Sequence, residues 1–348
     1  MIRFLEWISM LIKKDVDSLL SSGHTFQEFD GATITILGGT GFIGRWIIQA
    51  LHEFGSSFGF SSEITVISRN APMARNLFAE EFGLTPKIVE FDFATGLAKL
   101  EKSDFFINGA TPSTRKTGIE NVEAVYTSSV NASNSIIQSA KRYKNKPKVV
   151  NLSSGIVYGT QGLSERNQNE SAIVLQRDSQ SGYLNAKLAT ESIFSEAVVS
   201  NVVDSISPRL YAFAGPGISL NEHFAVGNFI RDGLDGNPIT IGGNPSTTRS
   251  YLYPTDLVVS ILAALIQPKN INVNIGSELP VTMLELATLI SELTSRKGVR
   301  ILGSDAVASN YVPSTSCFRE NYGVSQQISL NEGLDRWIEW LLTSGRAR

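Results

Sequence analysis

The sequence has few of the residues that form disulfides and metal sites. It contains one cysteine, Cys317, and three histidines, His24, His52 and His223, which stand far apart along 348 residues. A single cysteine cannot form an internal disulfide or a cysteine-based metal site, and widely separated histidines favour ordinary surface or packed imidazoles. We therefore expect no metal centre.

Charge of one sign and long apolar runs are equally scarce. The 30 basic and 33 acidic residues give a formal net charge of -3, which predicts neither a nucleic-acid surface nor an acidic tail. Near the N-terminus, Glu6 interrupts an apolar stretch, and Lys13 and Lys14 follow it. The pattern thus predicts neither a signal peptide nor a membrane span. We expect a cytoplasmic protein whose partners are small molecules, with no nucleic acid and no membrane among them.

Residues 1–30 are expected to form a helical extension. Apolar side chains recur there at helical spacing, at Phe4, Trp7, Ile8, Leu11, Ile12, Val16, Leu19 and Leu20. This pattern predicts an amphipathic helix that docks on the main body or on a second subunit. A membrane-surface anchor is the alternative, which Glu6, Asp15 and Asp17 disfavour because they remove the cationic character of the polar face.

From residue 32 onward, short apolar runs rich in β-branched residues alternate with helical patterns. The expected strands are 33–37, 64–67, 87–91, 105–107, 149–152 and 204–207, and the expected helices between them include 46–51, 122–143 and 183–199. Such alternation predicts an α/β protein with a Rossmann-type, doubly wound parallel sheet. We expect a dinucleotide-binding domain over residues 31–210.

After about residue 210 the alternation of long helical and strand patterns ends, because glycine and proline divide the sequence into short segments. Residues 211–348 are predicted to form mainly a smaller substrate-binding lobe, with some segments returning to the Rossmann domain. Helical patterns at 257–265, 284–293 and 334–342 would supply the packing of this part. Trp337 and Trp340, in the last of these, are expected to be core residues rather than cofactor contacts.

A glycine-rich motif, Gly38-Gly-Thr-Gly41-Phe-Ile-Gly44, lies between the first strand and the first helix. In that context, the glycines give a tight turn and let the backbone approach a pyrophosphate, which then faces the helix N-terminus. The predicted cofactor contacts are Gly38, Thr40, Gly41, Phe42, Ile43 and Gly44. A glycine-rich turn without a ligand is the alternative.

The residues after the second strand indicate which dinucleotide binds. Ser68, Arg69 and Asn70 follow that strand, whereas the nearby carboxylate, Glu63, precedes it. Arg69 could pair with a ribose 2′-phosphate, which favours NADP, with NAD as a further possibility; a solvated arginine is the alternative. Asp92 and Phe93, after the third strand, are also predicted to contact the cofactor.

Tyr183 and Lys187 are four residues apart and therefore share one face of the helix predicted over 183–199. A nearby ammonium group favours the phenolate, so we expect it to bring the tyrosine pKa closer to working pH for proton exchange with a carbonyl or an alcohol. Ser154 stands near the carboxyl end of the preceding strand, where its hydroxyl could hydrogen-bond the same oxygen.

These motifs resemble the extended short-chain dehydrogenase/reductases, a family that includes nucleotide-sugar epimerases, dehydratases and ketoreductases. The resemblance covers roughly residues 32–342 and rests on 38–44, Asn131, 152–159, 183–187, 209–217 and 249–256. It implies that Ser154 is the hydroxyl partner, Tyr183 the acid/base and Lys187 the ribose-binding residue. It also implies that Asn108, Gly109 and Ala110 run beside the cofactor, and that Ser154 and Arg249 bind substrate.

Several positions depart from the family pattern. Gly155 and Ile156 replace an Asp-Glu pair that serves dehydration in the family. Asn108 replaces the histidine that usually lies beside the cofactor. Ala212 stands where an asparagine usually contacts the nucleotide diphosphate, and 310–315 replaces a late Arg-Pro-Gly-Asp-like segment. Dehydration is therefore disfavoured, while a nucleotide-linked sugar is still the expected substrate.

Three functions fit these observations. The leading one is an NADP(H)-dependent ketoreductase or dehydrogenase; the second is an epimerase with tightly bound NAD; the third is a non-catalytic dinucleotide sensor or scaffold. The resemblance also implies a homodimer joined through the helices that contain Asn131 and Tyr183. The apolar faces are Ile136, Ile137, Ala140, Leu188, Ile193 and Phe194, which a monomer would use as core.

Overall fold

The computed structural model describes residues 26–112, 121–159, 168–172, 174, 181–222, 224–294, 297–303 and 307–344. Of the predicted N-terminal helical extension, residues 1–30, only 26–30 belong to this set, and the apolar pattern from Phe4 to Leu20 falls outside it. The described chain begins at Phe26, which is buried, and continues into a single 3₁₀ turn, η1 (Gln27–Phe29). Two compact units account for the chain: one of 1–157, 176–209 and 258–273, and the other of 158–175, 210–257 and 274–348.

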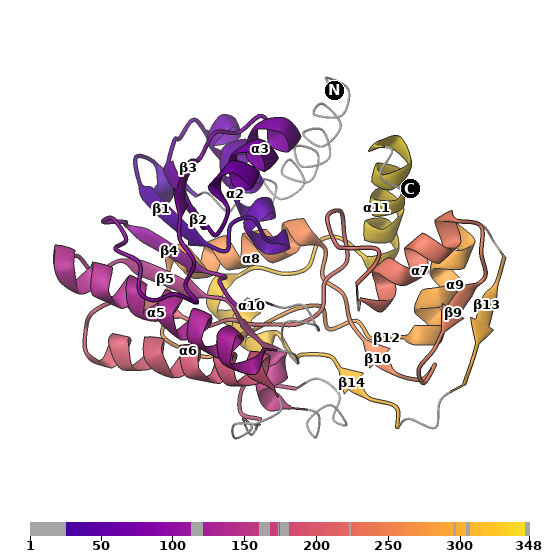
Figure 1. Cartoon of the computed structure of the whole chain (residues 1–348). Helices are drawn as coiled ribbons and strands as arrows, with labels where there is room; N and C mark the ends of the chain where they lie inside the picture. Colours follow the sequence, from indigo (N-terminus) through magenta and orange to yellow (C-terminus); the bar gives the residue numbers. More distant parts are fainter. Residues whose placement is uncertain are drawn as a thin grey trace. The chain divides into compact units, whose positions relative to one another are not determined.

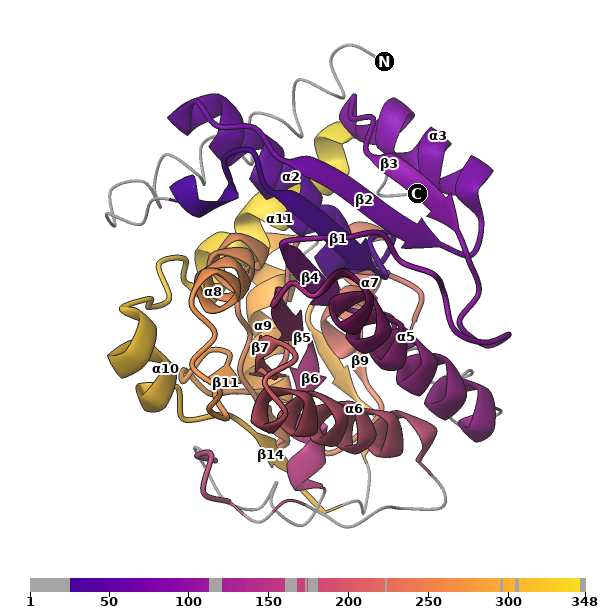
Figure 2. The same cartoon turned by 90° about the vertical axis from the view of Figure 1, so that its left-hand side faces the viewer.

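The first unit is built on a six-stranded sheet in the order β3-β2-β1-β4-β5-β7 (Figures 1 and 2). Its strands are β1 (Thr33–Leu37), β2 (Glu63–Ser68), β3 (Lys87–Glu90), β4 (Phe105–Asn108), β5 (Lys148–Asn151) and β7 (Asp204–Ile206). Every pairing in this sheet is parallel. The predicted α/β class with a parallel Rossmann-type sheet is therefore confirmed.

Helices connect these strands and bury one side of each against the sheet. They are α2 (Phe42–Phe58), α3 (Ala71–Phe82), α5 (Val122–Tyr143) and α6 (Gly182–Val199). Figure 2 shows α5 and α6 side by side on one face of the sheet. Strand residues such as Leu37 and Val149 pack with Ile136 and Phe194 of these helices in one apolar core.

The second unit consists of shorter elements. Its helices are α7 (Ala225–Leu234), α9 (Met283–Leu293), α10 (Ser316–Tyr322) and α11 (Leu330–Ser344), and its strands are β9 (Ile239–Ile241), β10 (Thr248–Arg249), β11 (Asn274–Ile275), β12 (Val281–Thr282), β13 (Val299–Ile301) and β14 (Asn310–Tyr311). Strand β10 pairs antiparallel with β12 and parallel with β14. Trp337 and Trp340 of α11 are buried, so the prediction that they are core residues is confirmed.

Four elements remain. Strand β6 (Ser153–Ser154) belongs to the first unit, and the residues of η2 (Gly155–Tyr158), β8 (Arg209–Leu210) and α8 (Pro254–Ile266) are divided between the units. None of the helices in the described ranges is both long and apolar enough to cross a bilayer.

Candidate active site

The strand order of the first unit reverses direction between β1 and β4, and this switch point is where open α/β sheets bind ligands. Gly38 follows β1 there with a φ of +83°, a left-handed conformation that favours glycine. A Cβ at Gly38 would lie 2.5 Å from the carbonyl oxygen of Gly109, which follows β4. The two turns therefore approach each other more closely than side chains would allow.

The predicted cradle residues lead from this turn into α2. Gly41 is the N-cap of α2 and supplies no side-chain cap, so the first N–H groups of the helix can serve an anion. A Cβ at Gly44 would lie 2.5 Å from the Cα of Gly39, which keeps the first turn of α2 tight against the loop. This glycine cradle fits the pyrophosphate of a dinucleotide.

The end of β2 holds the residues predicted to select the cofactor. Arg69 is exposed, and it forms no ion pair with any carboxylate in the described part of the chain. Asn70 is the N-cap of α3, and its Oδ1 accepts a hydrogen bond from Met73 N. Ser68 is buried, and its Oγ donates to Asn70 O at 3.2 Å.

A carboxylate that the sequence did not reveal also lies here. Glu90 ends β3 opposite Ser68, and its Oε2 accepts a hydrogen bond of 2.9 Å from Ala71 N, the first residue of α3. An acidic group at a helix N-terminus is favourable. Glu90 stands 22 residues after Ser68 in the sequence, so the sequence alone did not connect the two; only the parallel register of β2 and β3 brings them together.

Three of the predicted cofactor contacts have side chains that pack against or bond other parts of the protein. Asn108 is 4% exposed, and its Nδ2 donates to Ser133 Oγ and to Asn151 Oδ1 at 3.0 Å each. Phe93 belongs to the apolar core, and Asp92 Oδ1 accepts from Ala94 N. Any contact of Asn108 or Phe93 with a cofactor would therefore come from the backbone.

The predicted catalytic side chains converge at the carboxyl end of β5. The Ser154 hydroxyl forms a hydrogen bond with Tyr183. Lys187 lies one helical turn after Tyr183, with its Nζ 5.3 Å from the centre of the tyrosine ring. The same Nζ donates to the carbonyl oxygen of Leu152 at 2.6 Å, so the ammonium group is held beside the strand that carries Ser154.

Burial dominates the ionisation of this pair. It raises the pKa of Tyr183 above its ordinary value of 10.0, although the hydrogen bond from Ser154 acts in the opposite direction. Burial also lowers the pKa of Lys187 to about 7, while Glu191 raises it. The expectation that Lys187 brings the tyrosine pKa down is therefore wrong for the protein alone, because the desolvation cost of a buried phenolate is the larger effect.

Two residues beside this pair were not predicted as site residues. Glu191, one turn after Lys187 on α6, accepts hydrogen bonds from Arg209 and from Ser153. The four-residue spacing that linked Tyr183 to Lys187 continues to Glu191, and this spacing was the available signal. Arg209 appeared only as the start of a family motif.

In the second unit, Arg249 lies on β10 beside Tyr311 of β14. Its Nη1 donates to Thr248 O at 2.9 Å and to Ser309 O at 3.2 Å, and the guanidinium carbon is 5.9 Å from the centre of the Tyr311 ring. Tyr311 belongs to the segment that departs from the family pattern. Its ring also packs on Tyr211, with centres 4.4 Å apart.

The side chains expected at a dimer interface are only partly available. Ile136, Ala140 and Phe194 are buried in the core of the first unit. Leu188 and Ile193 keep partial exposure, and Ile137 packs against the core from its rim. Three of the six apolar residues predicted for a dimer interface are thus buried in the core of the first unit.

The parallel sheet, its switch point and the glycine cradle define an α/β protein of the dinucleotide-binding class. Residues 34–276 match the model of the NAD dependent epimerase/dehydratase family, so the chain belongs to this family. The resemblance to the extended short-chain dehydrogenase/reductases is confirmed, as is the expectation of an NAD(P)-dependent enzyme of that type.

Solved structures of similar fold support the architecture. The chain matches UDP-glucose 4-epimerase from Thermotoga maritima with a TM-score of 0.76 and 21% identity, over 90% of this chain and 99% of that one. It matches UDP-glucuronic acid 4-epimerase from Bacillus cereus, solved with UDP-glucuronic acid and NAD, with a TM-score of 0.73 and 20% identity, over 89% and 99% of the two chains.

Curated relatives include UDP-glucuronic acid decarboxylases. The Danio rerio protein is 24% identical over 90% of this chain and 73% of its own length. The Arabidopsis thaliana protein is 28% identical over 37% of this chain, and that match spans only 30% of the Arabidopsis protein.

Proposed function

We propose that the protein transfers a hydride between a bound dinucleotide and a carbon of a nucleotide-linked sugar, and that Tyr183, Ser154 and Lys187 handle the proton of that reaction. The observation that carries the proposal is the Tyr183–Ser154 hydrogen bond, with Lys187 buried one turn away on the same helix face. The similarity to proteins named as nucleotide-sugar epimerases and decarboxylases supports the substrate class.

The three side chains divide the work by their chemistry. The dinucleotide, when bound, accepts or returns the hydride. Tyr183 exchanges the proton of the sugar hydroxyl, acting as a general acid or base. Ser154 donates a hydrogen bond to the same sugar oxygen, and the Lys187 ammonium group stabilises the phenolate and holds the nicotinamide ribose. Because burial disfavours each charge alone, a phenolate and an ammonium group formed side by side cost less than the sum of the two charges formed separately.

The glycine cradle would hold the pyrophosphate through backbone groups, because Gly38 and Gly41 leave the start of α2 open to an anion. Exposed Arg69 supports a preference for NADP, because its guanidinium can pair with the 2′-phosphate. We assign Arg249, stacked near Tyr311, to the nucleotide diphosphate of the substrate. The enzyme acts as a homodimer in this proposal, with Leu188 and Ile193 as the partly exposed apolar residues of α6; sedimentation as a stable monomer would oppose that part.

Epimerisation is the second candidate, favoured by the similarity to two 4-epimerases. The same residues would oxidise a sugar carbon and return the hydride to its other face. An epimerase leaves no net change in the dinucleotide, whereas a reductase or dehydrogenase consumes it. Release of the dinucleotide from heat-denatured protein separates the two, since tightly held NAD supports epimerisation and an empty site that prefers NADPH supports reduction.

The test uses UDP-glucose, UDP-glucuronic acid and UDP-N-acetylglucosamine as probes, each with NAD(H) and NADP(H). Nicotinamide absorbance reports net redox change, and NMR of the recovered sugar reports epimerisation. Tyr183→Phe removes one hydroxyl and keeps the ring, so turnover should fall roughly 10²- to 10⁴-fold with unchanged melting and cofactor binding. The matched control is Tyr143→Phe, at the exposed end of α5, which should keep the wild-type rate.

Wild-type turnover by Tyr183→Phe would remove this tyrosine from the chemistry. Failure of all three probes, with dinucleotide binding intact, would overturn the substrate class and leave the dinucleotide site standing.

A further inference from the structure

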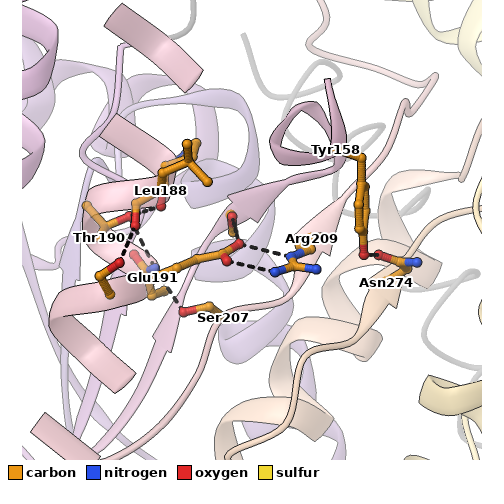
Figure 3. Close-up of polar contacts among 11 residues, drawn as sticks. Tyr158, Leu188, Thr190, Glu191, Ser207, Arg209 and Asn274 are labelled. Atoms are coloured by element: carbon orange, nitrogen blue, oxygen red, sulfur yellow. Dashed lines mark hydrogen bonds and ion pairs between the residues drawn. The ribbon is translucent and has the colours of Figure 1, made fainter. Parts of the chain in front are cut away.

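Ser153, Glu191 and Arg209 form a hydrogen-bonded cluster behind the proposed catalytic residues. The Ser153 hydroxyl donates to Glu191 Oε1 at 2.5 Å. Arg209 donates to the two carboxylate oxygens from Nε at 3.1 Å and from Nη2 at 2.9 Å, and Figure 3 shows the guanidinium facing the carboxylate. The Arg209 side chain is 3% exposed and that of Glu191 13%. A buried pair with two hydrogen bonds has a fixed geometry.

The cluster continues a regular pattern on α6. Tyr183, Lys187 and Glu191 are spaced by four residues and so occupy one face on three successive turns. These three side chains bond three consecutive residues, 152–154: Lys187 bonds the first, Glu191 the second and Tyr183 the third. The segment that carries the Ser154 hydroxyl is thereby attached to α6 at every residue.

Backbone hydrogen bonds fix the other side of the cluster. Ser153 N donates to Pro208 O at 2.9 Å, and Arg209 N donates to Val273 O at 2.8 Å. Glu191 therefore joins α6 both to the 152–154 segment and to the start of β8. A shift of α6 along its axis would break contacts with both segments at once.

We propose that Ser153, Glu191 and Arg209 are positioning residues, which hold the Ser154 hydroxyl and the Lys187 ammonium group at fixed places relative to Tyr183. This inference rests on the proposed function, because it assigns the cluster a role in the same reaction. None of the three is given a contact with substrate. Their effect is on the geometry of the catalytic groups, where a displacement on the order of 1 Å can lower a rate roughly 100-fold.

The charge of Glu191 adds a second effect on Lys187. The carboxylate raises the pKa of Lys187, which burial lowers to about 7. Replacing Glu191 by glutamine removes a negative charge and leaves the Arg209 charge uncompensated, and both changes lower the pKa of Lys187 further. The pH above which Lys187 is neutral then moves down, and so does the alkaline fall in turnover.

Two variants separate positioning from charge. Ser153→Ala removes the hydroxyl and leaves the buried ion pair intact, so it should fold normally and lower kcat about tenfold, with KM and the pH profile close to wild type. Glu191→Gln should lower kcat by roughly tenfold to 100-fold and also shift the alkaline limb to lower pH. Glu196→Gln, the same change on the exposed face of α6, is the control and should change neither quantity.

All three proteins are assayed with the probe sugar that wild type turns over best, together with thermal melting and dinucleotide titration. Wild-type kcat in both Ser153→Ala and folded Glu191→Gln would overturn the proposal. So would a loss of kcat accompanied by an equal loss of folded protein, because that is the behaviour of a residue that only stabilises the fold. Tyr183→Phe is measured in parallel. If this variant keeps the wild-type rate, the proposed function is wrong, and that failure is distinguished from a failure of the positioning proposal alone.

Discussion

The two ends of the parallel sheet in the first unit are both polar, but their polar groups are used in different ways. At the amino ends, side chains bond one another. Thr33 and Asp104 exchange hydrogen bonds of 2.8 to 3.0 Å between β1 and the residue before β4. Thr35 Oγ1 lies 2.5 Å from Ser103 Oγ. These contacts stabilise the starts of the strands.

At the carboxyl ends, glycines leave the backbone without side chains, and ionisable side chains lie close together. Glycine stands where β1 and β4 end, at Gly38 and Gly109. Lys187 is buried and Tyr183 is half-buried near Ser154, and the loss of solvation shifts both pKa values. Burying ionisable groups costs stability, so it is more typical of sites than of scaffolding.

The presence of a cavity does not by itself distinguish the carboxyl ends of the strands from their amino ends. A cavity of about 630 Å³ opens at the amino ends, lined by residues that include Thr35, His52, Phe60 and Ser103. Two of its charged lining residues, Lys87 and Glu101, bond each other at 2.6 Å. The chemistry of the lining, rather than the volume, therefore distinguishes the proposed active end, and matched substitutions at the two ends can test this assignment.

The largest contrast is expected between two lysines that each donate Nζ to a backbone carbonyl. Lys187 bonds Leu152 O at the carboxyl end, and Lys148 bonds Ile266 O at the amino end. Lys187→Ala should lower kcat by 100-fold or more, on the order of a general acid–base contribution, and weaken dinucleotide binding. Lys148→Ala should lower the melting temperature and leave kcat per folded molecule unchanged. Equal effects of the two changes on kcat would abolish the contrast.

A pair of serines sharpens the contrast with a smaller change. Ser154→Ala removes a hydrogen bond to developing charge and should cost about 2.7–4 kcal/mol in activation free energy at most. Ser103→Ala removes a buried hydroxyl that bonds Thr35 and should cost about 1 kcal/mol of unfolding free energy. Steady-state kinetics and urea unfolding on both variants measure the two quantities. A kinetic defect in Ser103→Ala would contradict the assignment of the amino end to stability alone.

The features that could be predicted from the sequence are those encoded locally. The glycine cradle follows from a motif of seven residues between a strand and a helix, and the Tyr183–Lys187 pair follows from the period of one helix. The strands of the sheet were recognisable because short runs rich in β-branched residues alternate with helical patterns, as expected for a parallel α/β sheet.

The features that could not be predicted depend on which segments the fold brings together. Arg209 meets Glu191 only because β8 begins beside α6, and Tyr311 meets Arg249 only through the pairing of β14 with β10. Asn108 is predicted to lie beside the cofactor, yet its amide donates to Ser133 of α5 and Asn151 of β5. The direction of a side chain at the end of a buried strand is set by neighbours that are distant in sequence.

A smaller effect is expected at the edge of the carboxyl end, where cofactor choice is proposed. Arg69→Ala should weaken NADPH binding about tenfold, the size of one charge-assisted hydrogen bond at an exposed site, and leave NADH binding unchanged. Arg75→Ala on α3 is the control and should change NADPH affinity less. Fluorescence titration with both cofactors gives the four constants. If NADH already binds wild type as tightly as NADPH, Arg69 does not select the cofactor.

The smallest effect is expected from the ion pair at the amino end. Lys87 and Glu101 bond each other at 2.6 Å, but their side chains are 54% and 68% exposed. Exposed pairs gain little because water screens the attraction and two long side chains lose conformational freedom, so Lys87→Met should cost about 0–1 kcal/mol of unfolding free energy. Turnover should stay at the wild-type level, since none of the proposed catalytic residues lies at this end. The pair also lines the cavity of about 630 Å³, and Lys87→Met therefore tests whether that cavity takes part in the reaction.

Urea unfolding and steady-state kinetics are measured on the same preparation, with Lys102→Met, a neighbouring lysine of the same cavity lining, as the control. A change of kcat or KM beyond threefold in Lys87→Met, with Lys102→Met at wild-type values, would show that the amino end is not merely structural and would remove the distinction between the two ends of the sheet.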